Sequence, residues 1–468
     1  MKDIRRRLIF SLSIYLAVVG FAAVSGALGQ ATTGGIVGLV TDPNGAAVPG
    51  ATVTAKNEAT GVTTRNFVTT SEGRFVITNL LPGTYSVTVA ASGFKTKTVS
   101  NINVRLGLDS DINIGLEVGQ PSETITVVAG ADEVAQTTSE ISANFDRRKV
   151  SELPTNAVGS GIDTLALTVP GVTPGFGNVN SNGTTLSVNG NRARSNNFTI
   201  DGTDNNDLSI GGPSYFISNP ELVQEFQIIT NNFSAQYGRN QGAIVNIVTR
   251  GGTNEFSGAA FIYHRNASAL DAMTNIERRT PGRSKRDKFI SNSFGGVLGG
   301  PIIKNRLFFF GSYFGIRQRQ NFTARAGNPA ILASEFPRLL STFPGNAAIQ
   351  ALTQQSAFAL TNFGTVRPRA DRPLDRICIS ASPATNCVVG GNETGFFAAA
   401  FPEREFSNPF TQNEFTIRGD WNVTSRDNVT VRYLWQDSVN ANALGGSNGF
   451  TGNIPARSKN LSGFYTRQ

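Results

Sequence analysis

Histidine and cysteine are scarce in this chain. Its 468 residues contain one histidine, His264, and two cysteines, Cys378 and Cys387. A single histidine excludes a histidine-rich zinc site and any reaction that needs several histidines. The phosphate-binding pattern GxxxxGK[ST] does not occur in the sequence. We therefore expect no enzyme activity, no metal site and no cofactor.

Long apolar runs are also scarce, and the one present stands at the N-terminus. A basic segment precedes an uncharged run at 8–24. The small residues Ala27 and Gly29 fit a cleavage site before Gln30. We expect residues 1–29 to be a cleaved signal peptide, with a retained transmembrane helix as the alternative. No later stretch reaches about 18 apolar residues, so the mature chain has no helical way to cross a membrane.

Export governs how the charge and the cysteines are interpreted. The formal net charge of +8 is spread along the chain, and the densest basic run, 278–288, is typical of a solvated loop. We expect no nucleic-acid partner. In an oxidising compartment Cys378 and Cys387 are expected to form a disulfide, with two free thiols as the alternative.

Short alternating runs separated by turn signals fill residues 30–118. The turns include DPNG at 42–45, SEG at 71–73 and LPG at 81–83. Strands at this spacing predict a small β-sandwich. Its core candidates are Val37, Leu39, Val53, Phe75, Ile77, Leu80, Tyr85, Val87 and Val89.

The same segment carries a family pattern. The string G-x-V-x-D-P-x-G-A-x-V-P-G-A-x-V runs from Gly38 to Val53, and F-x-I-x-N-L-L-P-G-x-Y-x-V begins at Phe75. The pattern resembles the carboxypeptidase regulatory-like domain. That resemblance implies a prealbumin-like β-sandwich of the carbohydrate-binding-like fold, without a peptidase centre. It leaves open whether this copy is a spacer or binds sugar.

A short segment at 119–130 follows this domain. It contains ETITVVA, which is rich in threonine and valine and could pair with another sheet edge or continue the preceding domain. The string resembles the TonB box of TonB-dependent receptors, which implies pairing with the TonB protein in the periplasm. The residues concerned are Glu123, Thr124, Ile125, Thr126, Val127, Val128 and Ala129.

Residues 131–254 are rich in glycine, asparagine, serine and threonine. Three stretches in order, at 187–207, 217–238 and 239–254, resemble the plug domain of TonB-dependent receptors. The resemblance implies an α+β domain with a helix and a strand within 217–238. Calcium binding and a solvated turn are alternatives for its acidic loop. The candidate substrate contacts in that loop are Asp201, Gly202, Asp204, Asn206 and Asp207.

Amphipathic strands fill residues 255–468. In 414–421 apolar and polar side chains alternate, as they do in 428–436. Alternation over about ten residues, with aromatic residues near the ends, is typical of a membrane β-barrel. A tight turn joins 421 to 428, whereas 318–412 forms a long loop with a helix near 332–362. Short turns on one side and long loops on the other also favour a barrel.

Together these features predict a mainly β protein. It consists of a β-sandwich, an α+β plug domain and the first strands of an incomplete transmembrane β-barrel. About six strands are found where a plugged transporter uses about 22, so we expect an N-terminal fragment of a longer protein.

The expected function is uptake through a plugged barrel in the outer membrane of a Gram-negative-type bacterium. The expected partners are TonB with its inner-membrane complex, and lipid. The substrate stays open between oligosaccharide, siderophore and peptide. The alternative is an exported surface or adhesion protein built of soluble β-sandwiches, for which carbohydrate binding stays open.

Overall fold

The computed structural model describes residues 33–467 with internal gaps. The gaps are 121–123, 129–134, 137–138, 154–160, 176–185, 208–211, 235–236, 239, 268–271, 274, 280–287, 326–329, 356–365, 369–374, 380–393, 401 and 441–453. The expected signal peptide, 1–29, lies outside the described residues. No helix within the described ranges is long and apolar enough to cross a lipid bilayer.

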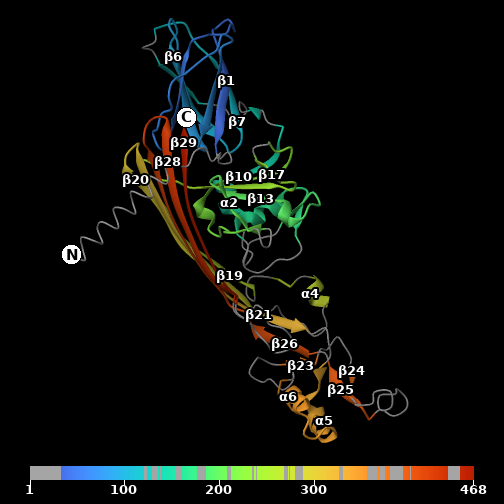
Figure 1. Cartoon of the computed structure of the whole chain (residues 1–468). Coiled ribbons are helices and arrows are strands. Elements are labelled where there is room, and N and C mark those ends of the chain that lie inside the picture. The colour runs from blue at the N-terminus through green and yellow to red at the C-terminus, as the bar shows by residue number, and fades with distance from the viewer. Residues whose placement is uncertain are drawn as a thin grey trace, which may run out of the picture.

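The N-terminal part is a two-sheet sandwich, drawn at the top of Figure 1. One sheet has the order β4-β1-β7-β9 and the other β3-β2-β5-β6-β8. The strands are β1 Gly34–Thr41, β2 Thr52–Asn57, β3 Phe67–Val68, β4 Arg74–Leu80, β5 Gly83–Ala90, β6 Thr96–Val104, β7 Asp109–Gly115, β8 Thr124–Val128 and β9 Ala135–Gln136.

The core of the sandwich confirms seven of the nine expected residues and corrects the other two. Ile36 and Val40 of β1 are fully buried, whereas Val37 and Leu39 are only partly buried. Apolar residues occupy both faces of this strand, so its alternation could not fix the inward face, and a one-residue slip exchanges the two faces. The other expected core residues are buried.

The plug region folds around a five-stranded sheet of order β10-β17-β18-β13-β14, shown green in Figure 1. The strands of the whole plug region, including two short two-stranded ribbons, are β10 Ile141–Asp146, β11 Val172–Pro174, β12 Leu186–Val188, β13 Asn197–Ile200, β14 Thr203–Asp204, β15 Asn206–Asp207, β16 Gly212–Pro213, β17 Val223–Asn231 and β18 Ile244–Thr249. Its helical elements are α2 Arg147–Glu152 and the 3-10 turns Ile162–Thr168, Ala193–Ser195 and Pro220–Leu222.

The helix expected within 217–238 is wrong in extent. Where this stretch is described, it has no α-helix; the 3-10 turn Pro220–Leu222 forms instead, with the Asn219 side chain accepting a hydrogen bond from the Glu221 N–H, and Tyr237 is in a second 3-10 turn. The next nine residues, Val223–Asn231, are a strand paired with both β10 and β18. Their β-branched and aromatic residues suit a buried strand better than a helix.

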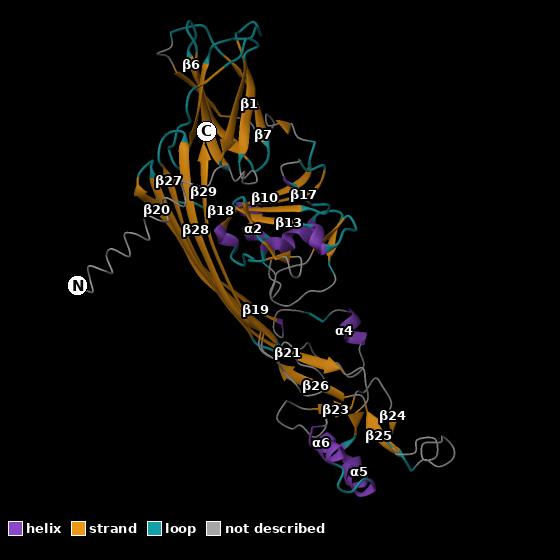
Figure 2. Ribbon diagram, in the orientation of Figure 1, coloured by secondary structure: helices purple, strands orange, loops and turns teal. Residues whose placement is uncertain are grey.

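The C-terminal part is a curved antiparallel wall of order β19-β20-β21-β27-β28-β29, shown as long bent strands in Figure 2. Its strands are β19 Ser257–Asn266, β20 Phe289–Ile303, β21 Leu307–Arg325, β27 Phe410–Asn422, β28 Asp427–Asn440 and β29 Ile454–Arg467. The two outermost strands, β19 and β29, each have one strand neighbour among the described residues.

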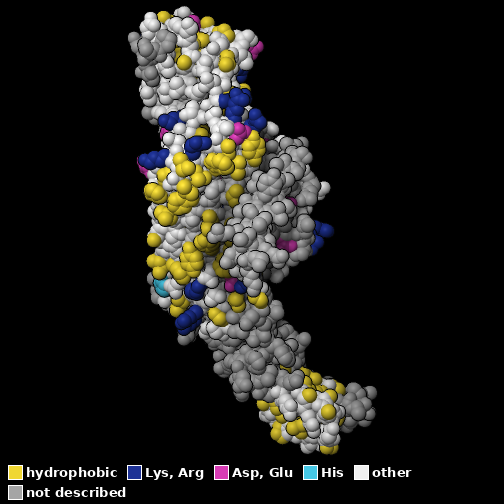
Figure 3. Space-filling view, turned by 60° about the vertical axis from the view of Figure 1, so that its left-hand side comes forward, with side chains coloured by type: hydrophobic (Ala, Val, Ile, Leu, Met, Phe, Trp, Pro, Cys, Tyr) yellow, Lys and Arg dark blue, Asp and Glu magenta, His cyan; other side chains and the backbone are white. Residues whose placement is uncertain are grey.

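The wall is apolar outside, and inside it is mainly polar on β27 and β28, while Val297, Phe310 and Leu434 pack on the apolar core of the plug. Glu414, Thr416 and Arg432 are fully buried, whereas Ile417 and Trp421 are about half exposed. The expected alternation is therefore confirmed, with the polar face turned toward the plug. Figure 3 shows the outward side chains as a yellow band over the wall, bordered above and below by lysine and arginine. Such a face suits lipid rather than water.

Connections at the two ends of the wall differ in length. Tight turns at 304–306 and 423–426 lie at the sandwich end, and long segments join the strands at the other end. The expected long loop 318–412 is shorter than predicted, because β21 continues to Arg325 and pairs there with β26, Pro402–Ser407.

A small subdomain lies within the long loop, at the bottom of Figure 2. The helix expected near 332–362 is divided around Pro344 and Gly345 into α5 Phe336–Thr342 and α6 Ala347–Gln355. A small apolar cluster around Leu339 and Phe397 packs the subdomain. The elements of the long segments are α4 Asn275–Arg279, β22 Ala330–Ile331, the 3-10 turn Ala333–Glu335, α5 Phe336–Thr342, α6 Ala347–Gln355, β23 Val366–Pro368, β24 Asp375–Cys378, β25 Phe396–Ala400 and β26 Pro402–Ser407.

Candidate functional site

A buried ion cluster joins the plug to the wall. It is built around Asp201, which follows β13 in a tight turn with Gly202, both residues having positive φ (47° and 73°). This backbone conformation is tolerated by aspartate and favoured by glycine. The turn places the Asp201 carboxylate, 3% exposed, against the inner face of the wall.

Two arginines of the wall bind this carboxylate. Arg418 Nη1 lies 3.4 Å from Asp201 Oδ1, and Arg432 Nη1 donates to Asp201 Oδ2. Arg418 also donates to Asp420 through Nη2, at 2.8 Å. The cluster thus holds two guanidinium groups and two carboxylates, so its charges balance.

Thr249 at the end of β18 completes the cluster from the plug side. Its N–H donates to Asp201 Oδ1 at 2.8 Å, and its hydroxyl donates to Asp201 Oδ2 at 2.7 Å. Its carbonyl accepts from Arg418 Nη1 at 2.7 Å. Because the plug residues and wall arginines share bonds, the plug cannot separate from the wall here without breaking several charge-assisted hydrogen bonds.

A second set of contacts runs along the same interface. Glu414 Oε2 accepts from the Ser218 N–H at 2.9 Å, and Gln412 donates to Ser218 Oγ at 2.7 Å. Tyr215 donates to the Trp435 carbonyl at 3.4 Å, and burial raises the pKa of Tyr215 well above its usual value. Uncharged Tyr215 therefore acts as a hydrogen-bond donor at this interface.

A polar row on the plug sheet connects to the sandwich. Asn144, Gln227, Asn246 and Thr199 are direct cross-strand neighbours on β10, β17, β18 and β13. Asn246 donates to Gln227 Oε1 at 3.2 Å, and Thr199 donates to Asn246 Oδ1 at 2.6 Å. Gln227 donates to the Leu106 carbonyl of the sandwich at 3.0 Å.

Glu225 strengthens this sandwich–plug junction. Its Oε2 accepts from the Leu106 N–H at 2.9 Å, and its Oε1 accepts from Asn144. Burial raises the pKa of Glu225, and these hydrogen bonds act in the opposite direction. Leu106 itself is fully buried. The loop after β6 is therefore fixed to the plug through both backbone groups of one residue.

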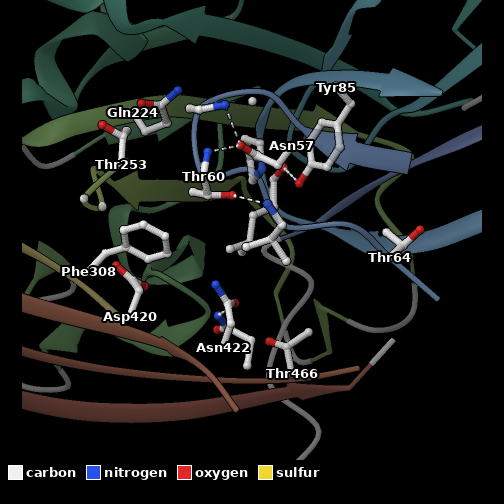
Figure 4. Close-up of a pocket in the computed structure, with 18 of the residues that line it drawn as sticks. Asn57, Thr60, Thr64, Tyr85, Gln224, Thr253, Phe308, Asp420, Asn422 and Thr466 are labelled. Atoms are coloured by element: carbon white, nitrogen blue, oxygen red, sulfur yellow. Dashed lines mark hydrogen bonds between the residues drawn. The ribbon is translucent and has the colours of Figure 1, made fainter. Parts of the chain in front are cut away.

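A cavity of about 590 Å³ lies where the three parts meet (Figure 4). Asn57, Thr60 and Tyr85 line it from the sandwich, Gln224 and Thr253 from the plug region. Wall residues that line it include Phe308, Asp420, Asn422 and Thr466. Arg418 and Asp420 line it as well as belonging to the ion cluster, so the cluster borders this cavity.

The expected loop residues do not act as one group. Asp201 is buried in the ion cluster, so a solvated turn is wrong for it. Asp204 is exposed and accepts from the Asn206 N–H, and Asn206 donates to Asn197. Asp207 pairs with Gly212 in a two-stranded ribbon. Among the described residues no cluster of histidine, cysteine and acidic side chains could hold a metal ion.

Two expected features lie partly outside the described residues. Thr124–Val128 form β8, an edge strand of the sandwich, while Glu123 and Ala129 are not described. Cys378 ends β24 and carries no free thiol, while Cys387 is not described, so their pairing stays a prediction.

Three family models match successive parts of the chain. They are "Carboxypeptidase regulatory-like domain" over 35–117, "TonB-dependent Receptor Plug Domain" over 133–245 and "Outer membrane beta barrel domain" over 248–468. With the sandwich, the plug and the inward-polar wall in this order, the chain belongs to the TonB-dependent receptors of the outer membrane that carry an N-terminal regulatory-like domain.

Within this class the chain is similar to the TonB-dependent transporter Oar of Myxococcus xanthus. The two are 28% identical over 249 residues, covering 53% of this chain and 23% of that protein. The chain thus spans about a quarter of the length of the curated relative it matches.

The chain is also similar to two solved structures of outer-membrane proteins. The outer membrane transporter YddB from Escherichia coli is 12% identical with a TM-score of 0.40, covering 70% of this chain and 37% of that one. The siderophore receptor PiuA from Acinetobacter baumannii is 11% identical with a TM-score of 0.31, covering 70% and 42%.

Proposed function

We propose that this chain is part of an outer-membrane transporter energised by TonB. The observation that carries the proposal is the plug sheet bonded to the polar inner face of the wall through Asp201, Arg418 and Arg432. A domain that fills the inside of a pore by polar contacts can close it and can rearrange to open it. No catalytic side chain is needed for such a task.

The box residues 123–129 are assigned the role of engaging TonB in the periplasm. Their position between the regulatory-like domain and the plug supports this role, because a pull on them would act on the plug that follows. The tight turns at 304–306 and 423–426 support a periplasmic location for the sandwich end, since periplasmic turns of such barrels are short. Delivery to the outer membrane requires the signal peptide proposed at 1–29.

The outward face of the wall favours this function over an adhesion protein of soluble sandwiches. Ile417, Trp421 and Val431 are each about half exposed on that face. Trp421 and Tyr465 flank Val429 at one level, and Tyr313 and Trp435 flank Phe415 six residues further along. Aromatic side chains at two separate levels of an outward apolar face are typical of the girdles of a membrane barrel.

A proline substitution in the box tests the proposal. Ile125→Pro removes a backbone donor and should abolish both TonB binding and uptake by the full-length protein. Ile125→Val, which keeps the strand, is the matched control. Binding can be measured with the purified C-terminal domain of TonB, and uptake with a panel of ferric siderophores, oligosaccharides and peptides. Unchanged binding in Ile125→Pro would remove the box assignment.

A further inference from the structure

The strand β8 occupies the edge of a sheet and has one open side. It pairs in parallel with β6, with Thr124 beside Thr96 and Val128 beside Ser100. The sheet order β3-β2-β5-β6-β8 gives β8 no second neighbour in the described part of the chain. In any strand, backbone N–H and C=O groups point alternately to the two sides. Half of those groups on β8 therefore face away from β6.

Of the described side chains of β8, Ile125 is partly buried, and Thr126 and Val127 are exposed. Val127 lies beside Val99, which is buried in the sandwich core, yet Val127 itself is 42% exposed. Thr126, on the opposite face, is exposed. Ser100 Oγ donates to the Val127 carbonyl at 3.4 Å. Backbone pairing with β6 along its whole length holds the strand in an extended form.

The chain after β8 returns to the same side of the sandwich. The short strand β9 pairs with β7, whose sheet faces that of β6, at Ser110 and Asp111. The linker therefore adds one strand to the edge of each sheet, β8 on β6 and β9 on β7. This attachment at two points keeps the box beside the sandwich instead of leaving it on a free tether.

We infer that the regulatory-like domain is the platform on which TonB binds the box. A strand of TonB adds to the outer side of β8 while β6 keeps the inner side, so both domains contribute to one continuous sheet. The inference rests on the proposed function, because it requires residues 123–129 to be the TonB box.

Preorganisation is the physical advantage of such a platform. Fixing a residue in an extended conformation costs backbone entropy. A box that is free in solution loses this entropy when it binds TonB, whereas a box already paired with β6 has lost it during folding. The platform is also bonded to the plug at Leu106, through Glu225 and Gln227. A pull on the composite sheet therefore reaches the plug by two routes.

A cross-link between β6 and β8 tests the platform. Thr98 and Thr126 are direct neighbours in the register, so Thr98→Cys with Thr126→Cys places two thiols side by side. The full-length double variant in outer membranes is titrated with the C-terminal domain of TonB, oxidised and then reduced. The reduced form of the same protein and Thr98→Cys alone are the controls.

The platform predicts that oxidised and reduced forms bind TonB within about threefold of each other. A loss of about tenfold or more on oxidation, restored by reduction, would overturn it, because the box must then leave β6. Hydrogen exchange of residues 96–100 gives a second measurement. Their protection should hold or rise when TonB binds, and a fall would contradict the platform. If Ile125→Pro still binds TonB normally, the proposed function fails together with the platform. If Ile125→Pro loses binding and the oxidised double variant loses it too, only the platform fails.

Discussion

At the scale of single residues, Asp201 is the side chain on which the plug–wall contact depends most. It is the one carboxylate that both Arg418 and Arg432 bind. A buried pair of this kind adds little net stability compared with apolar residues, because desolvation offsets the attraction. Removing one partner is different, since it leaves a charge buried without compensation.

We expect Asp201→Asn to weaken the attachment of the plug by about 3–5 kcal/mol, because Arg432 would keep its charge in a buried site. Hydrogen exchange of β13 and β18 in the membrane-bound protein measures this. Arg148→Gln, which removes an exposed pair with Glu152, is the control and should change nothing measurable. Adding Arg432→Met to Asp201→Asn should restore part of the loss; no recovery would contradict the charge argument.

A second residue-scale prediction concerns pH. Asp163 is 1% exposed, and its carboxylate has no hydrogen-bond partner within the described part of the chain. Burial raises the pKa of Asp163 to about 7. The folded plug then holds a proton that the unfolded chain loses above about pH 4, so stability falls as the pH rises from about 4 to 7.

The loss over this window amounts to at most roughly 4 kcal/mol, and Asp163→Asn should abolish it. Exchange-derived stability of β17 at pH 5 and pH 8 measures the difference. Glu152→Gln, an exposed carboxylate on α2, should leave the slope unchanged. An equal pH slope in Asp163→Asn and in the unsubstituted protein would refute the assignment.

The sequence singled out Asp201 but not its partners. A local acidic string drew attention to the loop, and alternation placed Arg418 and Arg432 on the polar face of their strands. Over 200 residues separate them from Asp201, so no local pattern could pair them. The sequence does place an arginine on the inward face of each of two adjacent strands. A buried charge needs a partner, so these arginines could have predicted an acidic residue opposite them.

At the scale of elements, alternation predicted strands where only one face is apolar. The strands β27 and β28 followed their patterns, because one face meets the plug and the other is exposed. The strand β1 did not, since its apolar residues occur on both faces. The stretch 217–231 became a turn and a strand because pairing on both sides with β10 and β18 decided its conformation.

The polar row across the plug sheet yields an element-scale prediction. Gln227→Leu leaves the Asn246 amide without its partner, at a cost of about 1–3 kcal/mol, and leaves the Leu106 carbonyl with the Asn144 bond alone. The sandwich should loosen from the plug, seen as faster exchange of residues 105–108. Gln224→Leu, three residues earlier on the same strand and partly exposed at the cavity, is the matched control. Equal effects of the two changes would argue against the row.

At the scale of the whole molecule, the order of parts was predictable and their contacts were not. The lengths of the turns and loops in the sequence distinguished the two ends of the wall. Nothing local indicated that Asn254 would donate to the Thr60 carbonyl, or Asn79 to the Arg467 carbonyl, and so bring the sandwich onto the wall ends. These two contacts join residues that lie 194 and 388 positions apart in the sequence.

This orientation predicts opposite accessibility of the two ends. Gln350→Cys, exposed on α6, should react with a membrane-impermeant maleimide in intact cells. Lys304→Cys, exposed in the turn between β20 and β21, should react only after the outer membrane is permeabilised. The unsubstituted protein serves as the blank. Labelling of both positions in intact cells would contradict the orientation.

The plug–wall interface has a polar part beside the apolar contacts of Val297, Phe310 and Leu434, and the polar part affects how it can open. Contacts such as Ser218 with Glu414 and Gln436 with the Phe216 carbonyl exchange for contacts with water at small net cost, about 0.5–1.5 kcal/mol each. Parting two apolar surfaces would cost about 25 cal/mol for every Å² exposed. An interface of this kind can hydrate as it separates and dry as it closes again, so repeated opening does not require the plug to unfold.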